Sequence, residues 1–218
     1  MSRETTVICK AWLYLSALLW LLILAGHLTA GQTKLVSFEE DDKWGYKNAS
    51  GQVVIKPQFV MANDFLPEGI GAVLDKQGWA YINKKGKIII RPFVFDNGPD
   101  YFREGLARYE LNGKMGFFDK RGRVVIRPQF EFAYWFQEGL SAICMGCKTA
   151  RVGEYGVVGG GKWGYINKKG RMVIAIQFDD ASPFEKGTAM VKVNGKAMII
   201  DRTGRILRAS TTGPVVTR

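Results

Sequence analysis

The sequence has almost no histidine: among its 218 residues the only one is His27, inside an apolar segment near the N-terminus. Ser-His-Asp and Cys-His nucleophiles need imidazole as a base, and common zinc sites need it as a ligand. Beyond the N-terminal segment the sequence therefore excludes hydrolases built on those plans. We expect no bound metal and no cofactor.

Cysteine is also scarce, with Cys9, Cys144 and Cys147 the only three. Cys9 precedes the apolar run, so no cysteine follows that run where a lipid would be attached. Cys144 and Cys147 lie three residues apart, and in an oxidising compartment they would form a small disulfide. The alternatives are a redox-active pair, which needs a helix start in a βαβ setting, and a metal site completed by a second chain.

Long apolar runs are limited to residues 11–28. Arg3 and Lys10 precede this run, and small residues follow it, which is the pattern of a secretory signal. Eighteen apolar residues also approach the lower limit for a membrane-spanning helix. We expect residues 1–31 to be a hydrophobic export helix, either a signal peptide cut after Ala30 or Gly31 or a membrane anchor. Both place the remaining chain outside the cytoplasm: secreted, periplasmic or held at the outer face of the membrane.

What the sequence contains in abundance is a repeat. A Trp-Gly site followed by a glycine turn recurs over residues 43–51, 78–86, 114–122, 162–170 and 196–204. The turns begin at positions 48, 83, 119, 167 and 201, so the spacings are 35, 36, 48 and 34. A fixed period of this size is typical of repeat architectures. The one long spacing places an insertion near residues 144–161.

Each copy has the composition of a β-hairpin. Asn or Asp at the first place of the turn and Gly at the fourth suit a type I turn. The preceding arm is aromatic and the following arm is β-branched, which favours strands. The second arm reaches Pro57, Pro92 or Pro128, where we expect it to end because proline cannot continue a ladder. A third short strand should follow each Glu-Gly step.

In this order the residues resemble the bacterial WG-repeat proteins, whose unit carries Lys-Trp-Gly-aromatic, Asx-x-x-Gly and Pro-x-Phe landmarks. The resemblance covers residues 38–207. Met115 replaces Trp in the third copy, Ala80 replaces Gly in the second, and the fifth has only Ala197-Met198, as expected of a degenerate terminal copy. The landmarks that we interpret as structural are Trp44, Gly45, Gly51, Trp79, Gly86, Gly116, Gly122, Trp163, Gly164, Gly170 and Gly204.

The resemblance implies an all-β array without a shared catalytic motif. We expect residues 32–207 to form one domain of five tandem hairpin repeats, arranged as an open β-solenoid-like array. The alternative is a small β-propeller, although three strands per copy fall short of four-stranded blades. Residues 208–218 should be a flexible C-terminal tail.

The charge is strongly basic, with 31 Lys and Arg against 20 Asp and Glu. Such a surface attracts anionic glycopolymers, acidic lipids or acidic proteins. The candidate binding rim is formed by the basic turn residues Lys84, Lys85, Lys120, Arg121, Lys168 and Lys169. The alternative is that these side chains only maintain solubility and keep strand edges unpaired.

The aromatic residues have two interpretations. Trp44, Trp79 and Trp163 at equivalent places would suit sugar platforms, but Met115 stands at the same place in the third copy, so we expect a hydrophobic slot. Trp135 breaks the repeat and is the better candidate for an exposed binding aromatic.

Carboxylates offer the one route to catalysis, because a glycosidase needs only a facing pair of them. Glu68, Glu104 and Glu138 recur, but each precedes a glycine, where an acid is expected to cap a turn. We therefore expect an exported, non-enzymatic module for binding or scaffolding, with a protein partner or another component of the cell envelope. Adhesion to an anionic or glycan polymer is the alternative, and a carboxylate-dependent glycan hydrolase is third. No nucleic acid is expected, and a membrane is expected only at the N-terminal segment.

Overall fold

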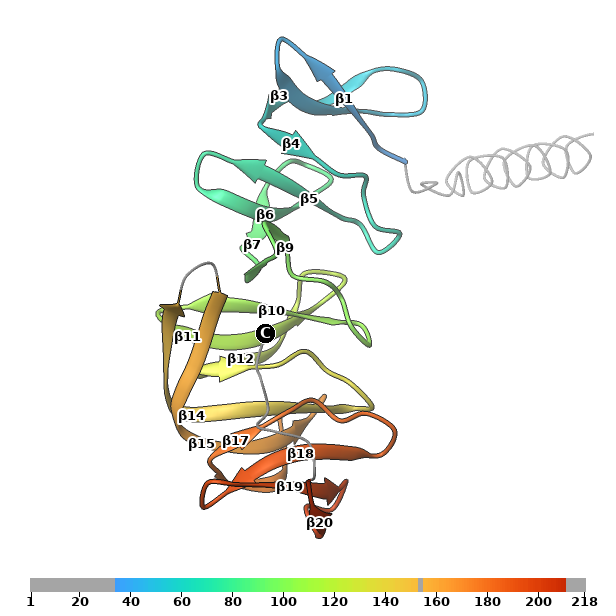
Figure 1. The fold of residues 1–218 in the computed structure, drawn as a ribbon. Coiled ribbons are helices and arrows are strands. Elements are labelled where there is room, and N and C mark those ends of the chain that lie inside the picture. The colour runs from blue at the N-terminus through green and yellow to red at the C-terminus, as the bar shows by residue number, and fades with distance from the viewer. Residues whose placement is uncertain (1–33, 153–154, 211–218) are drawn as a thin grey trace, which may run out of the picture. The chain divides into compact units, whose positions relative to one another are not determined.

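The computed structural model describes residues 34–152 and 155–210, and the secondary structure there is strand and turn (Figure 1). Residues Leu35–Arg218 form a compact unit distinct from Met1–Lys34. The predicted export helix and residues 211–218 of the predicted tail lie outside the described residues. Within the described part, no helix has the length and apolar character to cross a membrane. The prediction of an all-β repeat domain is confirmed.

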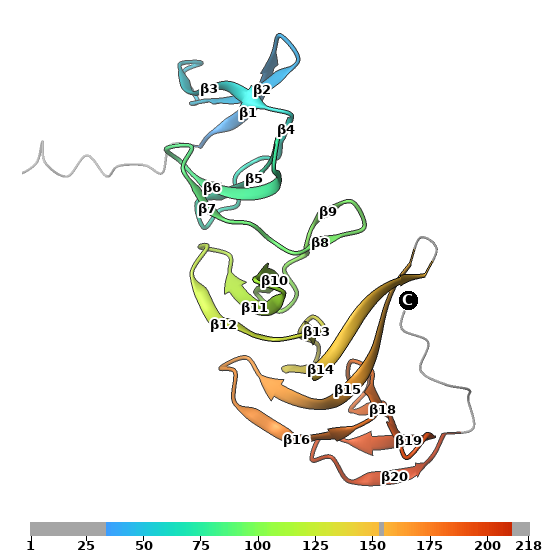
Figure 2. The ribbon, with the colours of Figure 1, turned by 90° about the vertical axis from the view of Figure 1, so that its left-hand side faces the viewer.

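The strands form five successive antiparallel sheets and one small ribbon (Figures 1 and 2). The first sheet contains β1 (Val36–Glu40), β2 (Lys43–Lys47) and β3 (Val53–Phe59). The second contains β4 (Met61–Ala62), β5 (Ile70–Asp75), β6 (Gly78–Asn83) and β7 (Ile88–Ile90). The ribbon of β8 (Val94–Phe95) and β9 (Gly98–Pro99) precedes the third sheet, which contains β10 (Leu106–Leu111), β11 (Lys114–Asp119) and β12 (Val124–Phe130). The fourth contains β13 (Phe132–Ala133), β14 (Leu140–Val152), β15 (Tyr155–Asn167) and β16 (Met172–Phe178). The fifth contains β17 (Asp180–Ala181), β18 (Thr188–Val193), β19 (Lys196–Asp201) and β20 (Ile206–Ala209).

No sheet of the described residues closes into a barrel. Three of the sheets have four strands, because β4, β13 and β17 each add a short first strand. The expectation of only three strands per unit is therefore wrong for these sheets, and strand number does not argue against propeller blades. The sequence reasoning missed these strands because each is only two residues long.

Each sheet after the first combines strands from two successive copies of the sequence repeat. The strand after one Glu-Gly step, such as β5, pairs with the Trp-Gly strand of the next copy, here β6, with Leu74 opposite Trp79. In the third sheet β10 pairs with β11 in the same way. Consecutive copies are therefore joined by a complete ladder of hydrogen bonds, so removing one copy would break a sheet.

The turns between the last two strands of all five sheets are the expected Asx turns. In the first, Asn48 Oδ1 accepts hydrogen bonds from the N–H groups of Ser50 at 3.1 Å and Gln52 at 2.9 Å. In the fifth, Asp201 Oδ1 accepts from Thr203 at 2.9 Å and Arg205 at 3.1 Å. The glycine that ends each turn has a positive φ of 75° to 86°, which glycine adopts without a steric penalty.

Gly116 of the third Trp-Gly site faces a bulge in the neighbouring strand. The prediction that the strand ends at Pro128 is wrong: β12 continues to Phe130, which lies opposite Met115. Between this pair and the next, the register shifts, and a Cβ on Gly116 would lie 2.5 Å from the carbonyl oxygen of Ile126 and 2.7 Å from the nitrogen of Pro128. Proline suits the bulge because it lacks the N–H that a regular ladder would use. The glycine is needed because the bulged backbone occupies the space of a side chain.

Gly45 and Gly164 repeat this arrangement, with Cβ positions 2.5 Å and 2.7 Å from a carbonyl oxygen. The two copies without the glycine lack the shift at this place, and each keeps only the later one, between Tyr81 and Ile82 or between Ile199 and Ile200. Where Ala80 stands, β7 ends at Ile90 and the chain leaves the sheet toward the ribbon. Where Met198 stands, it pairs with Ala209, and Ile199 pairs with Arg208 without a shift between them. The bulge at this place therefore occurs in the three copies that keep the glycine of the Trp-Gly site.

The core lies within and between consecutive sheets, and Trp163 is among its largest buried side chains, with 1% of its surface exposed. Met115, at the equivalent place, is 3% exposed, whereas Trp44 and Trp79 are half-buried against neighbouring cores. These positions are hydrophobic slots. Burial raises the pKa of Tyr81 to about 12, helped by the charge of Asp100.

Candidate interaction surface

A ladder of three ion pairs joins consecutive sheets. Glu68 pairs with Lys120 at 3.8 Å, Glu104 with Lys168 at 3.5 Å, and Glu138 with Arg202 at 3.4 Å. In each pair the acid precedes the strand that pairs with the Trp-Gly strand of its sheet, namely β5, β10 or β14, and the base is the second residue of the Asx turn in the next sheet. These bases are therefore already partnered, and each exposed pair contributes little stability on its own.

The recurring glutamates also bind backbone N–H groups of the next sheet. Both carboxylate oxygens of Glu104 accept from the N–H of Gly139, at 3.1 and 3.0 Å, and Glu138 accepts from Gly187 at 3.0 Å. The predicted capping role is thus present, but it acts between sheets rather than within one turn. The spacing of the glutamates in the sequence did not indicate that they contact the next sheet.

The predicted basic rim divides into two sets. Lys120 and Lys168 belong to the ion-pair ladder. Lys84 is half-buried, with its Cε 4.0 Å from the place of a Cβ on Gly69. The exposed side chains of Lys85, Arg121 and Lys169 form no ion pair within residues 34–152 and 155–210. Only this second set is available to attract an external anion.

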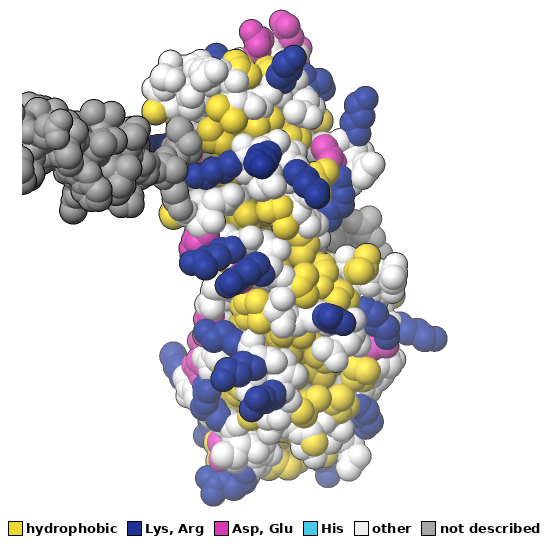
Figure 3. Space-filling view, turned by 180° about the vertical axis from the view of Figure 1, so that it is seen from behind, with side chains coloured by type: hydrophobic (Ala, Val, Ile, Leu, Met, Phe, Trp, Pro, Cys, Tyr) yellow, Lys and Arg dark blue, Asp and Glu magenta, His cyan; other side chains and the backbone are white. Residues whose placement is uncertain are grey.

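The last strands of the five sheets carry an exposed apolar surface that the sequence analysis did not single out. Two residues at equivalent places in each strand have 39% to 49% of their surface exposed. We call these ten residues the apolar band: Val53, Val54, Ile88, Ile89, Val124, Val125, Met172, Val173, Ile206 and Leu207. Figure 3 shows hydrophobic side chains gathered along this face of the domain, with Lys and Arg side chains beside them.

Basic residues border the band at fixed places. The residue before each apolar pair is exposed, and in four of the five strands it is basic: Lys87, Arg123, Arg171 and Arg205, with the neutral Gln52 in the first strand. Two of them are held by the turn acids: Arg123 lies 2.7 Å from Asp119 and Arg205 lies 3.1 Å from Asp201. Hydrogen bonds from the Thr203 hydroxyl and from backbone N–H groups lower the pKa of Asp201 to about 2. This acid therefore stays ionised at neutral pH and holds Arg205 beside the band.

The sheets meet along the same strands. A Cβ on the turn glycine Gly122 would lie 2.8 Å from Cγ2 of Ile89 in the preceding sheet, and one on Gly204 would lie 2.8 Å from Cγ2 of Ile174. Each of these turns therefore packs closely on the strand before it. These contacts place the last strands of neighbouring sheets next to one another, so the apolar pairs recur from one sheet to the next.

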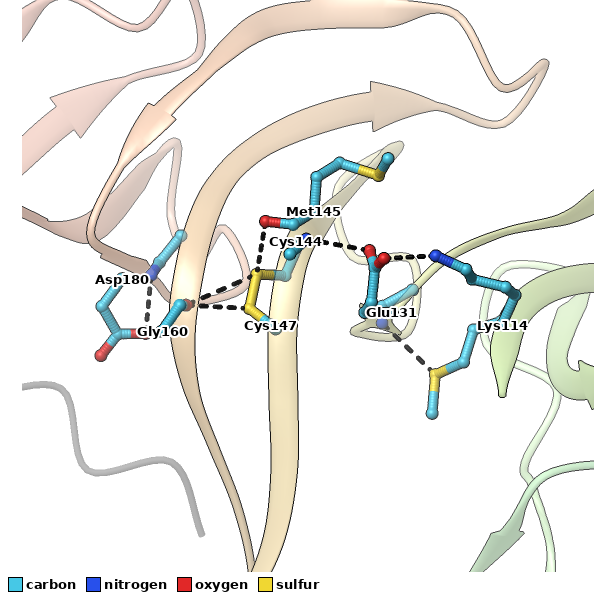
Figure 4. Close-up of a disulfide and its surroundings, with 11 residues drawn as sticks. Lys114, Glu131, Cys144, Met145, Cys147, Gly160 and Asp180 are labelled. Atoms are coloured by element: carbon cyan, nitrogen blue, oxygen red, sulfur yellow. Dashed lines mark hydrogen bonds and ion pairs between the residues drawn. A yellow bond between two sulfur atoms is a disulfide. The ribbon is translucent and has the colours of Figure 1, made fainter. Parts of the chain in front are cut away.

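The fourth sheet carries the insertion and the disulfide (Figure 4). In the third sheet, Asn112 and Gly113 form a two-residue turn with φ values of 54° and 71°. At the equivalent places stand Gly146 and Gly161, with φ values of 74° and 65°, but residues 147–160 are inserted between them and extend the ladder. The inserted hairpin of the fourth sheet therefore takes the place of the two-residue turn found in the third sheet.

The Cys144–Cys147 bridge spans this junction, with its Cα atoms 5.9 Å apart. Both cysteines are buried. Glu131 supports the same place, because it accepts from the Gly146 N–H at 3.0 Å and pairs with Lys114. The bridge and this carboxylate fix the base of the inserted hairpin. Within the described residues, no group of three or more His, Cys, Asp or Glu side chains lies close enough to hold a metal.

Trp135 is half-buried rather than fully exposed. Its indole N–H donates to Gln137 Oε1 at 3.1 Å, and the guanidinium of Arg103 lies 4.6 Å from the centre of its ring. It packs against the fourth-sheet core and against Phe95 of the ribbon. The predicted binding aromatic is therefore part of a mixed aromatic and cationic cluster.

These features define an all-β repeat protein whose exposed apolar pairs recur along the sheets. The family described as WG containing repeat matches residues 44–77, 79–114, 115–148 and 163–196, which together are more than half of the chain. The chain belongs to this family. The predicted fifth copy, residues 196–204, lies almost wholly outside the matched segments.

No curated protein matches the chain. Among solved structures, one similar chain is a protein of unknown function from Bacteroides caccae, determined at 1.35 Å resolution. The two are 13% identical over 81% of this chain and 77% of the other, with a TM-score of 0.27. At that score the likeness carries no argument about fold or function.

Proposed function

We propose that this protein is an exported, non-enzymatic binding module whose working surface is the apolar band, and that its partner is a protein of the cell envelope. The observation that carries the proposal is the recurrence of exposed apolar pairs at the same two places in all five last strands. Single exposed apolar residues are common on protein surfaces, but contiguous patches are typical of interaction sites. The basic border favours a partner with an acidic rim around an apolar centre.

Two observations favour this partner over adhesion by the basic turns. Lys120 and Lys168 are partnered within the domain, so the predicted rim offers fewer available charges than its sequence indicates. The band instead offers apolar area, which drives most protein association. The non-enzymatic assignment is supported by Glu104 and Glu138, whose carboxylates are engaged with backbone N–H groups.

The test compares two pairs of substitutions with the same chemistry. Val54→Thr with Val125→Thr changes two band residues that are 45% and 43% exposed, while Val36→Thr with Val94→Thr changes residues that are 44% and 51% exposed outside it. Threonine keeps the β-branched shape but adds a hydroxyl. The full-length chain in neutral detergent would be incubated with envelope extract, and retained proteins would be quantified by mass spectrometry.

A partner of the band should bind the wild type and the control pair equally. The band pair should weaken its affinity about thirtyfold, because two sites that each lose roughly 1 kcal/mol of apolar contact lose about 2 kcal/mol together. The binding should persist in high salt, because apolar contacts are not screened. Equal retention by all three chains would refute the assignment of the band. Retention that disappears with salt alone would instead support adhesion through charge.

Export is tested separately. Expression of the full chain followed by cell fractionation should find the domain outside the cytoplasm. The mass of the mature chain then separates the two forms of the proposal, since cleavage after Ala30 or Gly31 removes the apolar run and an anchor retains it. A domain recovered only from the cytoplasm would overturn both.

A further inference from the structure

We propose that the cluster around Trp135 is a second binding site, which takes a carboxylated sugar residue of an anionic glycan. The site lies at the ribbon of β8 and β9, which Figure 2 shows on the side of the domain away from the last strands β3, β12 and β16. It is therefore separate from the apolar band, and the proposal goes beyond a protein partner for that band.

Three aromatic side chains form a continuous row at this site. Phe95 contacts Tyr101 edge to face at 6.5 Å and Trp135 at 6.2 Å between ring centres. Tyr101 is the most exposed large hydrophobic side chain of the described residues, at 58%, and Phe95 and Trp135 are half-buried. Partly exposed aromatic rings held by such contacts offer apolar area at the surface, which suits the CH face of a sugar.

Two arginines lie over the same indole ring, and only one of them has a carboxylate partner. Arg108, which is 2% exposed, lies 5.6 Å from the ring centre of Trp135 and pairs with the buried Asp100 at 2.6 Å. Asp100 also accepts from the Arg108 Nε at 3.0 Å, so this charge is neutralised inside the domain. Arg108 therefore supports the aromatic row from within.

Arg103 is the second arginine, and its exposed side chain has no acidic partner among residues 34–152 and 155–210. The adjacent acid, Glu104, turns away to Gly139 and Lys168 of the next sheet. The Cζ atom of Arg103 lies over the Trp135 ring, 4.6 Å from its centre. A guanidinium that packs on an aromatic ring and has no acidic partner can still offer its N–H fork to a carboxylate.

The combination selects the chemical class of the ligand. A neutral sugar would use the aromatic row but leave Arg103 without an anion, and a bare anion would use Arg103 but not the row. A sugar with a carboxylate on its ring satisfies both. At the equivalent place in the next unit stands Gln137, which binds the Trp135 indole N–H and carries no charge. The site is therefore present once, despite the repeated fold.

The experiment uses the full-length chain in neutral detergent and two probes of equal length, tetragalacturonate and neutral galactotetraose. Isothermal titration should detect tetragalacturonate with a Kd of about 1 mM or tighter, and at least tenfold weaker binding of galactotetraose. Arg103→Gln, which installs the residue found in the next unit, should weaken tetragalacturonate binding at least tenfold. Arg103→Lys should also weaken it, because lysine keeps the charge but loses the planar fork.

Matched variants separate this site from general attraction to a basic protein. Arg121→Gln removes another exposed, unpaired arginine and should leave the Kd unchanged, whereas Tyr101→Ser should weaken binding without altering charge. Val54→Thr with Val125→Thr should bind the sugar normally, so failure of the band and failure of this site are distinguishable.

The proposal is overturned if the two probes bind equally, if Arg121→Gln costs as much as Arg103→Gln, or if wild type binds neither probe. A tetraglutamate peptide provides the last test. Binding of that peptide as tight as tetragalacturonate would show that the site recognises an anion rather than a sugar.

Discussion

Gly116→Ala should destabilise the domain far more than a single methyl group ordinarily does. The added Cβ would lie 2.5 Å from the Ile126 carbonyl oxygen, 2.7 Å from the Pro128 nitrogen and 2.9 Å from the Arg127 carbonyl carbon. All three are backbone atoms of β12, so no rotation of a side chain relieves the clash. Strand β12 must move away from β11 or lose its bulge.

The size of the effect follows from two contributions. Overpacking a closely packed site costs about 1–3 kcal/mol. Moving β12 also weakens the Met115–Phe130 end of the ladder, and each hydrogen bond lost there costs roughly 1 kcal/mol. We expect a total loss of about 3 kcal/mol, which for a domain of this size corresponds to a fall in Tm of about 6–12 °C.

Urea unfolding followed by circular dichroism would measure the change, and hydrogen exchange of the third-sheet N–H groups would show whether it is local. Gly159→Ala is the matched control, because Gly159 lies in a strand, has no atom within 4 Å of its Cβ position and has no positive φ. It should change stability by less than about 1 kcal/mol. The reasoning is refuted if Gly116→Ala unfolds within about 0.5 kcal/mol of the wild type with its third-sheet exchange unchanged.

Three further predictions concern the contacts between and within sheets. Glu138→Gln should lower the unfolding free energy by about 1 kcal/mol in urea, because it weakens a bond to the next sheet, whereas Glu185→Gln, in the final unit, should have no measurable effect; equal losses would contradict the ladder. The pKa of Asp201 is held near 2 in the folded state. Its contribution to the free energy of unfolding is therefore complete above the unfolded pKa near 4 and is lost as the pH falls toward 2. Asp201→Asn should make the free energy of unfolding less dependent on pH below pH 4, and an unchanged dependence would contradict this prediction. Replacing both Cys144 and Cys147 by Ala should lower the free energy of unfolding by about 2 kcal/mol, which is the chain entropy of a four-residue loop. Reduction of the wild type should give the same loss. An unchanged free energy of unfolding in both experiments would show that the bridge does not stabilise the domain.

Local chemistry accounts for what could be predicted reliably. The turn at residues 119–122 needs a hydrogen-bond acceptor at its first place and a residue that adopts a left-handed backbone at its fourth. Both requirements can be recognised from the four residues of the turn alone. The same holds for the β-branched arm after it, whose side chains favour an extended backbone. These features depend on residues close together in the chain, so the repeat, the strand type and the hairpins could be derived without coordinates.

The bulge opposite Gly116 shows where that reasoning fails. Proline at 128 correctly indicated a break in the ladder, but the strand absorbs it and continues for two residues. The outcome depends on whether the facing residue on β11 has a side chain, and facing residues are known only once the register is set. Ala80 and Met198 had been noted as departures from the motif, yet their structural consequence could not be seen from the motif itself.

For the candidate sites too, the sequence showed which residues recur but not what they contact. The basic turn residues were predicted from their recurrence, but the sequence did not show that Lys120 and Lys168 are paired with glutamates of the preceding sheet. Exposure of Val54 or Val125 was also hidden, because a β-branched residue in a strand is as easily buried as exposed. Arg103 was not singled out, since its place over Trp135 joins residues 32 positions apart.

The all-β array of about 35-residue hairpin units follows from the sequence, because turns and strand propensities depend on neighbouring residues. How each copy shares a sheet with the next, which charges remain unpaired and which apolar residues face solvent became known only from the folded chain. These properties arise from packing between strands and sheets, where a residue's partner is set by register and contact rather than by its neighbours in the chain.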